Sequence, residues 1–148
     1  MLTQTLNKLF KRDLNKLKEE IKLYSNESNL WIVDKDVLNS GGNLCLHLVG
    51  NLNHFIGAEI GKTNYIRQRD LEFSLKNVPR TELIQQIDDV ILVIDQVLHT
   101  LTEEDLQKEY SRRVFEDTMT VEYFLVHLSM HLGYHLGQIN YHRRLLDS

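Results

Sequence analysis

Apolar side chains recur every three or four residues through most of the chain, which is the spacing of an α-helix with one buried face. The first such segment runs from about residue 2 to residue 24, with lysine, arginine, glutamate and asparagine between its apolar positions. These positions are Leu6, Leu9, Phe10, Leu14, Leu17, Ile21 and Leu23. The pattern predicts an amphipathic helix packed along one side.

Three further helices are predicted by the same spacing. The second follows Gly41 and Gly42, runs from about residue 43 to residue 59 or 60, and ends at the GKT of residues 61–63. The third, residues 81–101, follows Pro79, a residue tolerated where a helix begins. The fourth is expected to extend to about residue 146, with Thr120 as its N-cap and Glu122 in its first turn.

Polar connections separate these segments. The stretch of residues 25–42 interrupts the helical pattern, residues 63–78 are expected to form a long loop, and residues 102–119 a loop with one helical turn. Four helices with long connections predict an all-α four-helix bundle. A chain of 148 residues without an internal repeat is expected to form a single domain over residues 1–148.

Composition narrows the class of protein. Hydrophobic residues make up 42% and charged residues 26%, as in ordinary soluble proteins, and the net charge of −4 comes from interspersed acids and bases. This distribution does not suggest a nucleic-acid-binding surface. No apolar run approaches the roughly 20 residues of a membrane span, and the charged N-terminus lacks the apolar core of a signal peptide. With one cysteine, Cys45, the sequence predicts a cytoplasmic protein.

Four of the seven histidines lie in "HLSMHLGYHLGQINYHRR", residues 127–144. His131 and His135 are four residues apart, so on a helix they lie one turn apart and can converge on one metal ion. His127 precedes His131 by the same spacing but lies about 12 Å along the helix axis from His135. A single ion therefore binds at most two adjacent members of this trio. The alternative to a metal site is that these histidines only make one face of the helix polar.

The predicted second helix offers a further ligand. His47 and His54 are seven residues apart and share one face with Asn43 and Asn51. Cys45 points away from that face and is expected to be a buried small hydrophobic residue. Spacing alone leaves the choice between His47 and His54 open.

Other residues in these segments allow two interpretations. His142, followed by two arginines, is expected to interact with the C-terminal dipole of the last helix, and His99 with that of the third. Gln138 either orients a ligand or makes an ordinary polar contact. In residues 67–70, two arginines and an aspartate, Arg67, Arg69 and Asp70, either order a loop through a salt bridge or bind an anionic substrate.

The pattern H-x-x-x-H-x-G-Q in "HLGYHLGQI", about 85 residues after "LHLVGNLNHFIG", resembles the DinB-like superfamily of four-helix bundles. "GGNLCLHLVGNLNHFIGAEIG" and "RQRDLEF" resemble one of its uncharacterised bacterial subgroups. The resemblance extends over nearly the whole chain. Members typically bind a divalent metal, often zinc or nickel, through one histidine of the second helix and two of the fourth. The resemblance implies His47, His131 and His135 as ligands; many relatives have arginine where this chain has Leu136.

The resemblance also implies a function. Characterised relatives include transferases and isomerases that use low-molecular-weight thiols such as bacillithiol or mycothiol. The expected protein is a metal-dependent enzyme that activates a thiol or water nucleophile for a small-molecule substrate and forms a homodimer. The expected pocket or supporting residues are Asn51, His54, His127 and Gln138. The alternative is a non-catalytic metal-binding or stress-associated bundle, which His54 or His127 as a fourth ligand would favour.

Two other metal-site classes are excluded by spacing. A di-iron carboxylate bundle needs Glu-x-x-His pairs, and no glutamate stands three residues before any histidine. A zinc protease of the H-E-x-x-H type needs glutamate directly after its first histidine, where this chain has Leu132.

Overall fold

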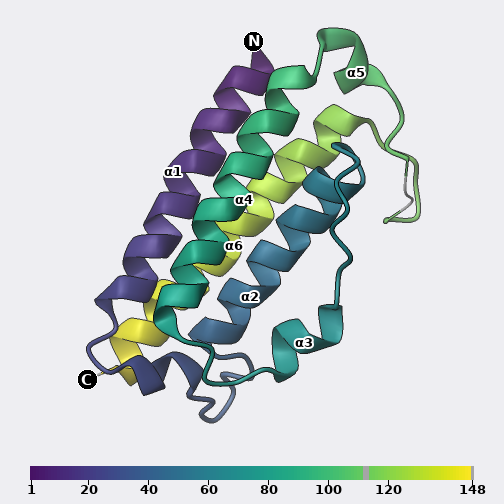
Figure 1. Cartoon of the computed structure of the whole chain (residues 1–148). Coiled ribbons are helices and arrows are strands. Elements are labelled where there is room, and N and C mark those ends of the chain that lie inside the picture. The colour runs from purple at the N-terminus through teal and green to yellow at the C-terminus, as the bar shows by residue number, and fades with distance from the viewer. Residues whose placement is uncertain (112–113, 148) are drawn as a thin grey trace.

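Four long helices lie side by side in the computed structural model, which describes residues 1–111 and 114–147 (Figure 1). They are α1 (Leu2–Leu23), α2 (Gly41–Leu52), α4 (Arg80–Thr100) and α6 (Val121–Leu146). Over the described residues the protein is all-α, with six α-helices and no β-strand. The all-helical class predicted from the sequence is therefore confirmed.

The long helices bury their apolar faces against one another. Helix α1 packs on α4 and α6, and α2 packs on the same two helices, whereas α1 and α2 touch only slightly. Fully buried leucine and isoleucine side chains from each helix meet in the interior, among them Leu14, Leu52, Ile87 and Leu128. This arrangement places α2 beside α6, the two helices that carry most of the histidines.

Three helix boundaries agree closely with the sequence pattern. Helix α1 ends at Leu23, and α4 begins directly after Pro79. The side chain of Thr120 accepts a hydrogen bond from the backbone N–H of Tyr123, so Thr120 is the N-cap of α6 as predicted.

The second helix differs from the expected continuous α-helix. It begins two residues earlier, at Gly41, because the side chain of Ser40 accepts a hydrogen bond from the N–H of Asn43 and caps it. The α-helical part ends at Leu52 and continues as a wider π-turn, η2 (Asn53–Ala58). There the N–H of Glu59 bonds to the carbonyl of His54, five residues back, so the helix widens only after His54.

The expectation of a loop over residues 63–78 was wrong in part, because a short helix, α3 (Arg69–Ser74), lies within it. The side-chain amide of Asn43 donates hydrogen bonds to the carbonyls of Glu72 and Leu75, at 3.0 and 2.8 Å. The last carbonyls of a helix have no hydrogen-bond partner within that helix. Here the side chain of Asn43, on α2, supplies the donor. This tertiary contact has no counterpart in the local sequence pattern.

The remaining connections are short helical turns. Residues 25–40 include a 3-10 turn, η1 (Glu27–Trp31), and residues 102–119 include α5 (Glu103–Gln107), which is the expected helical turn. Helix α5 begins with a reciprocal cap in which Thr102 and Asp105 each bond the other's backbone N–H.

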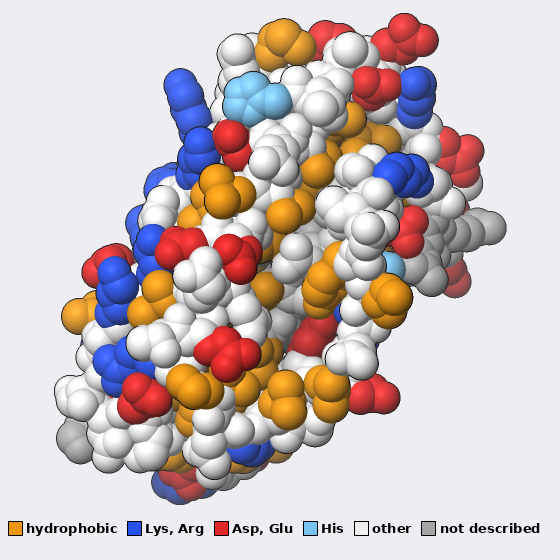
Figure 2. Space-filling view, viewed as in Figure 1, with side chains coloured by type: hydrophobic (Ala, Val, Ile, Leu, Met, Phe, Trp, Pro, Cys, Tyr) orange, Lys and Arg blue, Asp and Glu red, His pale blue; other side chains and the backbone are white. Residues whose placement is uncertain are grey.

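The burial of the single cysteine agrees with the prediction from the sequence. Cys45 is fully buried, as predicted. Lysine and arginine side chains line the α1 edge in Figure 2, with acidic side chains among them and over α4. None of the described helices is both long and apolar enough to cross a membrane.

Candidate metal centre

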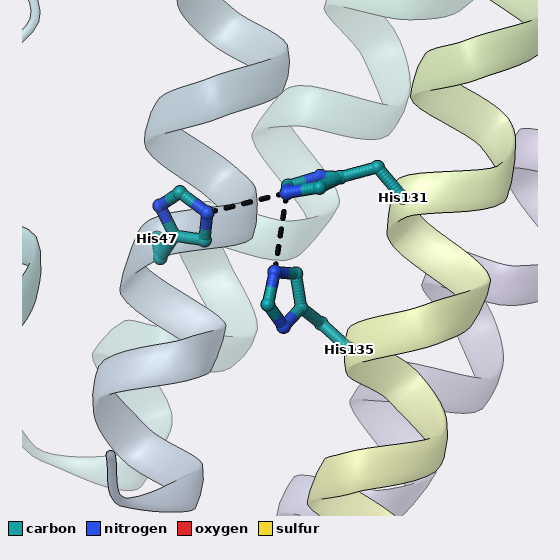
Figure 3. Close-up of side chains that lie close together, drawn as sticks. All are labelled: His47, His131 and His135. Carbon is teal, nitrogen blue, oxygen red and sulfur yellow. Dashed lines mark hydrogen bonds between the residues drawn. The ribbon is translucent and has the colours of Figure 1, made fainter. Parts of the chain in front are cut away.

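Three histidine side chains meet in the space between α2 and α6. His47 extends from α2, and His131 and His135 extend from successive turns of α6 toward it (Figure 3). The Nε2 atom of His131 lies 3.4 Å from Nε2 of His47 and 3.1 Å from Nε2 of His135. All three potential ligand atoms lie within 4.8 Å of one another.

These separations suit a single ion. Two imidazole nitrogens bound to zinc at about 2.1 Å, at a tetrahedral angle, lie about 3.4 Å apart. The observed separation between His47 and His131 has this value, and that between His131 and His135 is slightly shorter. The three residues present, whose potential ligand atoms all lie within 4.8 Å of one another, therefore fit a divalent cation such as zinc or nickel.

Two of the three rings are held by a second hydrogen bond. The Nδ1 atom of His47 lies 3.1 Å from Oε1 of Glu72, and Nδ1 of His135 lies 2.7 Å from Oε1 of Gln138. Both oxygens accept a hydrogen bond from Nδ1–H, which leaves the Nε2 lone pairs directed toward His131, as in carboxylate–histidine–metal arrangements. His131 differs, because its Nδ1 is buried and has no hydrogen-bond partner among the residues that the structure describes.

Burial also sets the charge of the α6 histidines. Burial, together with smaller contributions from the neighbouring His135 and His47, lowers the pKa of His131 to about 4. Burial lowers the pKa of His135 as well. Both rings are neutral near pH 7, which is the form that binds a metal ion.

Glu72 is a site residue that the sequence analysis did not identify. Its buried carboxylate receives two hydrogen bonds from Arg67, Nε to Oε2 at 2.9 Å and Nη2 to Oε1 at 3.0 Å, besides its contact with His47. Burial opposes ionisation, but the bonds from His47 and Arg67 hold the pKa of Glu72 below its ordinary value. The salt-bridge interpretation of the arginine segment is thus confirmed for Arg67, with Glu72 rather than Asp70 as partner.

The histidine cluster opens into a pocket of about 440 Å³, the metal pocket. Its other lining residues are Asn39, Leu44, Asn51, Phe55, Arg67, Arg69 and Phe73. Asn51 is 7% exposed, and its amide oxygen is buried with no hydrogen-bond partner in the described part of the chain. Such an acceptor in the wall of a pocket suits a donor group of a bound molecule.

The other candidate pocket residues lie farther from the cluster. His54 lies beside Glu59, 3.7 Å between Nε2 and Oε1, and against the ring of Phe55. The ring of His127 stacks at 6.4 Å from that of His131. Neither lines the metal pocket or joins the group of three, whereas Gln138 touches the site through His135.

The expectation for His142 was wrong. Its ring is buried, with Nδ1 2.6 Å from the hydroxyl of Tyr24 and Nε2 2.9 Å from the carbonyl of Ile32. The ring joins α6 to α1 and to the connection before α2 instead of facing the helix end. His99 is exposed near the end of α4, and its Nδ1 contacts the carbonyl of Asp95.

The comparisons with known proteins supply a family but no activity. Residues 2–148 match a family described as "Protein of unknown function (DUF1572)". Among curated proteins, none matches the chain.

Proposed function

We propose that this chain, which belongs to the DUF1572 family of proteins of unknown function, is a divalent-metal-dependent enzyme. His47, His131 and His135 would hold the ion, with zinc or nickel as the expected metal. The observation that carries the proposal is the convergence of three histidine nitrogens within 4.8 Å of one another, with two Nε2–Nε2 separations, 3.4 and 3.1 Å, suited to one tetrahedral ion.

The composition of the cluster favours catalysis over a structural role. Structural zinc sites normally close with four protein ligands, and catalytic sites keep a position for water or substrate. Within residues 1–111 and 114–147 the cluster consists of three histidines, and it adjoins the metal pocket. Three neutral ligands leave the ion its full charge, so it can lower the pKa of bound water or bind a thiolate.

The protein's own residues would orient the reacting group. Glu72 and Gln138 would hold the rings of His47 and His135, and Arg67 would keep Glu72 ionised. The amide oxygen of Asn51 would accept a hydrogen bond from a water, hydroxyl or thiol group in the metal pocket.

The resemblance to the DinB-like superfamily narrows the proposed reaction. Its four-helix bundle is compatible with the packing of α1, α2, α4 and α6. On this basis the reaction would be transfer to or from a low-molecular-weight thiol, resembling a thiol S-transferase, in the cytoplasm. Hydrolysis by an activated water is the second chemistry open to the same ligand set.

A homodimer is part of the proposal. Large apolar side chains are exposed on α6 at positions that share one side of the helix, namely Tyr123, Met130 and Tyr134. A second copy would cover them. Sedimentation of the wild type beside Met130→Glu tests this: a dimer that the variant converts to monomer is expected, and a monomeric wild type contradicts it.

Metal content tests the central claim. Elemental analysis of gently purified protein is expected to find about one zinc or nickel per chain, and none in His131→Ala. His99→Ala removes an exposed histidine outside the cluster and is expected to keep the metal. A wild type that takes up neither ion on reconstitution would refute the enzyme and the metal-binding alternative together.

A further inference from the structure

A second cavity, of about 380 Å³, lies between the residues just before α2 and the last turns of α6. We call it the side cavity. Its apolar walls are formed by Val37, Leu38, Leu44, Tyr141, Leu145 and Leu146. Leu38 and Leu145 are 76% and 68% exposed, so the cavity is lined by large apolar side chains that are not buried in the hydrophobic core. Exposed apolar groups that cluster around one cavity commonly mark a binding site.

The side cavity adjoins the metal pocket. Asn39 and Leu44 line both. Gln138 lines the side cavity and holds His135 of the metal centre through a hydrogen bond of 2.7 Å. A molecule bound beside His135 therefore has an apolar space directly next to it.

The buried polar group of the side cavity is already satisfied. His142 lines it, but both ring nitrogens are engaged, one by the Tyr24 hydroxyl and the other by the Ile32 carbonyl. The ring therefore contributes carbon surface and not a binding nitrogen. The side cavity is suited to hydrocarbon and offers little to a charged group, except at Asp36 in its lining.

We propose that the side cavity binds the apolar arm of the substrate whose reacting group occupies the metal pocket. The substrate class would be a small molecule with a metal-binding or nucleophile-accepting head and a short alkyl or single-ring arm. The volume of the side cavity, about 380 Å³, lies near the lower end of the roughly 300–1,000 Å³ of small-molecule pockets. An arm bound there is therefore limited to a short alkyl chain or a single ring. This inference rests on the proposed metal-dependent function.

A series of straight-chain alkanethiols, from ethanethiol to hexanethiol, tests the inference on protein loaded with cobalt in place of zinc or nickel. Binding of sulfur to cobalt gives a charge-transfer absorption, so each dissociation constant can be measured by titration. Burial of each added methylene is expected to tighten binding about fourfold until the arm fills the cavity.

Two variants and a matched control test whether the dependence of binding on the length of the thiol arises in the side cavity. Leu38→Gln and Leu145→Gln change exposed side chains of the side cavity, so the fold is expected to survive while the dependence on chain length flattens. Leu92→Gln changes a leucine that is 60% exposed on α4 and is expected to keep the full dependence.

The outcomes separate the two proposals. Cobalt uptake and thiol binding without dependence on chain length would overturn the side-cavity inference and leave the metal site standing. Equal flattening by Leu92→Gln would also overturn it. Absence of cobalt uptake would refute the metal site itself, and the inference with it. If the protein is a dimer and the length of the alkanethiol affects binding only after the dimer dissociates, a second copy of the protein occupies the side cavity. That result would overturn the side-cavity inference.

Discussion

Gly50 of α2 faces the carboxylate of Glu72, and a Cβ built on Gly50 would overlap that carboxylate. The missing side chain lets α3 approach α2 closely enough for Glu72 to reach Nδ1 of His47. A glycine in the middle of a helix costs up to about 1 kcal/mol relative to alanine. Here that cost permits the contact between a carboxylate and a candidate ligand.

Gly50→Ala is expected to displace Glu72 and to weaken zinc binding about 10- to 100-fold, the usual effect of losing a carboxylate that supports a metal-binding histidine. Competition with a chromogenic chelator measures the affinity. Gly137→Ala is the matched control, because a Cβ at that exposed helical position meets no atom of residues 1–111 or 114–147 within 4 Å beyond its own helix and chain neighbours. Equal zinc affinities in Gly50→Ala and the wild type would contradict the role assigned to Glu72.

Glu72→Gln is expected to destabilise the metal-free protein, because it removes the charge that pairs with Arg67. Both side chains are largely buried, 7% and 12% exposed, and breaking a buried ion pair from one side costs about 3–5 kcal/mol. Urea unfolding measures the loss. The double variant Arg67→Gln/Glu72→Gln should lose less than Glu72→Gln alone; a larger loss would mean that the pair does not act as a unit.

Cys45 is expected to be unreactive in the folded protein. The thiol is fully buried, and burial raises its pKa to about 12, so the thiolate is scarce at neutral pH. Alkylation by iodoacetamide should be about a thousandfold slower or more than in urea, since it requires global or large local opening. Rapid alkylation without denaturant would show that α2 opens readily and that the metal pocket is less fixed than its contacts indicate.

Stability of the metal-free protein is expected to fall as the pH drops from about 6.5 toward 4. The pKa of His131 is about 4 in the folded chain, below the roughly 6.5 of an unfolded chain, so unfolding takes up a proton in this window. Unfolding midpoints in urea at pH 6.5 and 4.5 measure the slope. His131→Gln should flatten it, and His99→Gln should not. An equal slope in His131→Gln would assign the pH dependence to other groups.

Local geometry accounts for what the sequence by itself determined. The three- and four-residue spacing of apolar side chains located α1, α4 and α6, because helical periodicity depends only on neighbouring residues. The convergence of His131 with His135 follows from the same rule, since residues one turn apart on a helix face the same way. The Thr120 cap is local too, because its side chain bonds a backbone N–H only three residues later. Burial of Cys45 followed from its place on an apolar face.

Contacts between distant segments were decided only by the tertiary structure. Asn43 orders α3 within a segment that has no helical pattern of its own, and α3 then brings Glu72 to His47, 25 residues earlier in the chain. His54 lies beside Glu59 and outside the group of three histidines, and the contact with Tyr24 at the end of α1 turns His142 inward. Each outcome depends on which surfaces meet across the interior, and the spacing of residues within one segment carries no information about a partner in another.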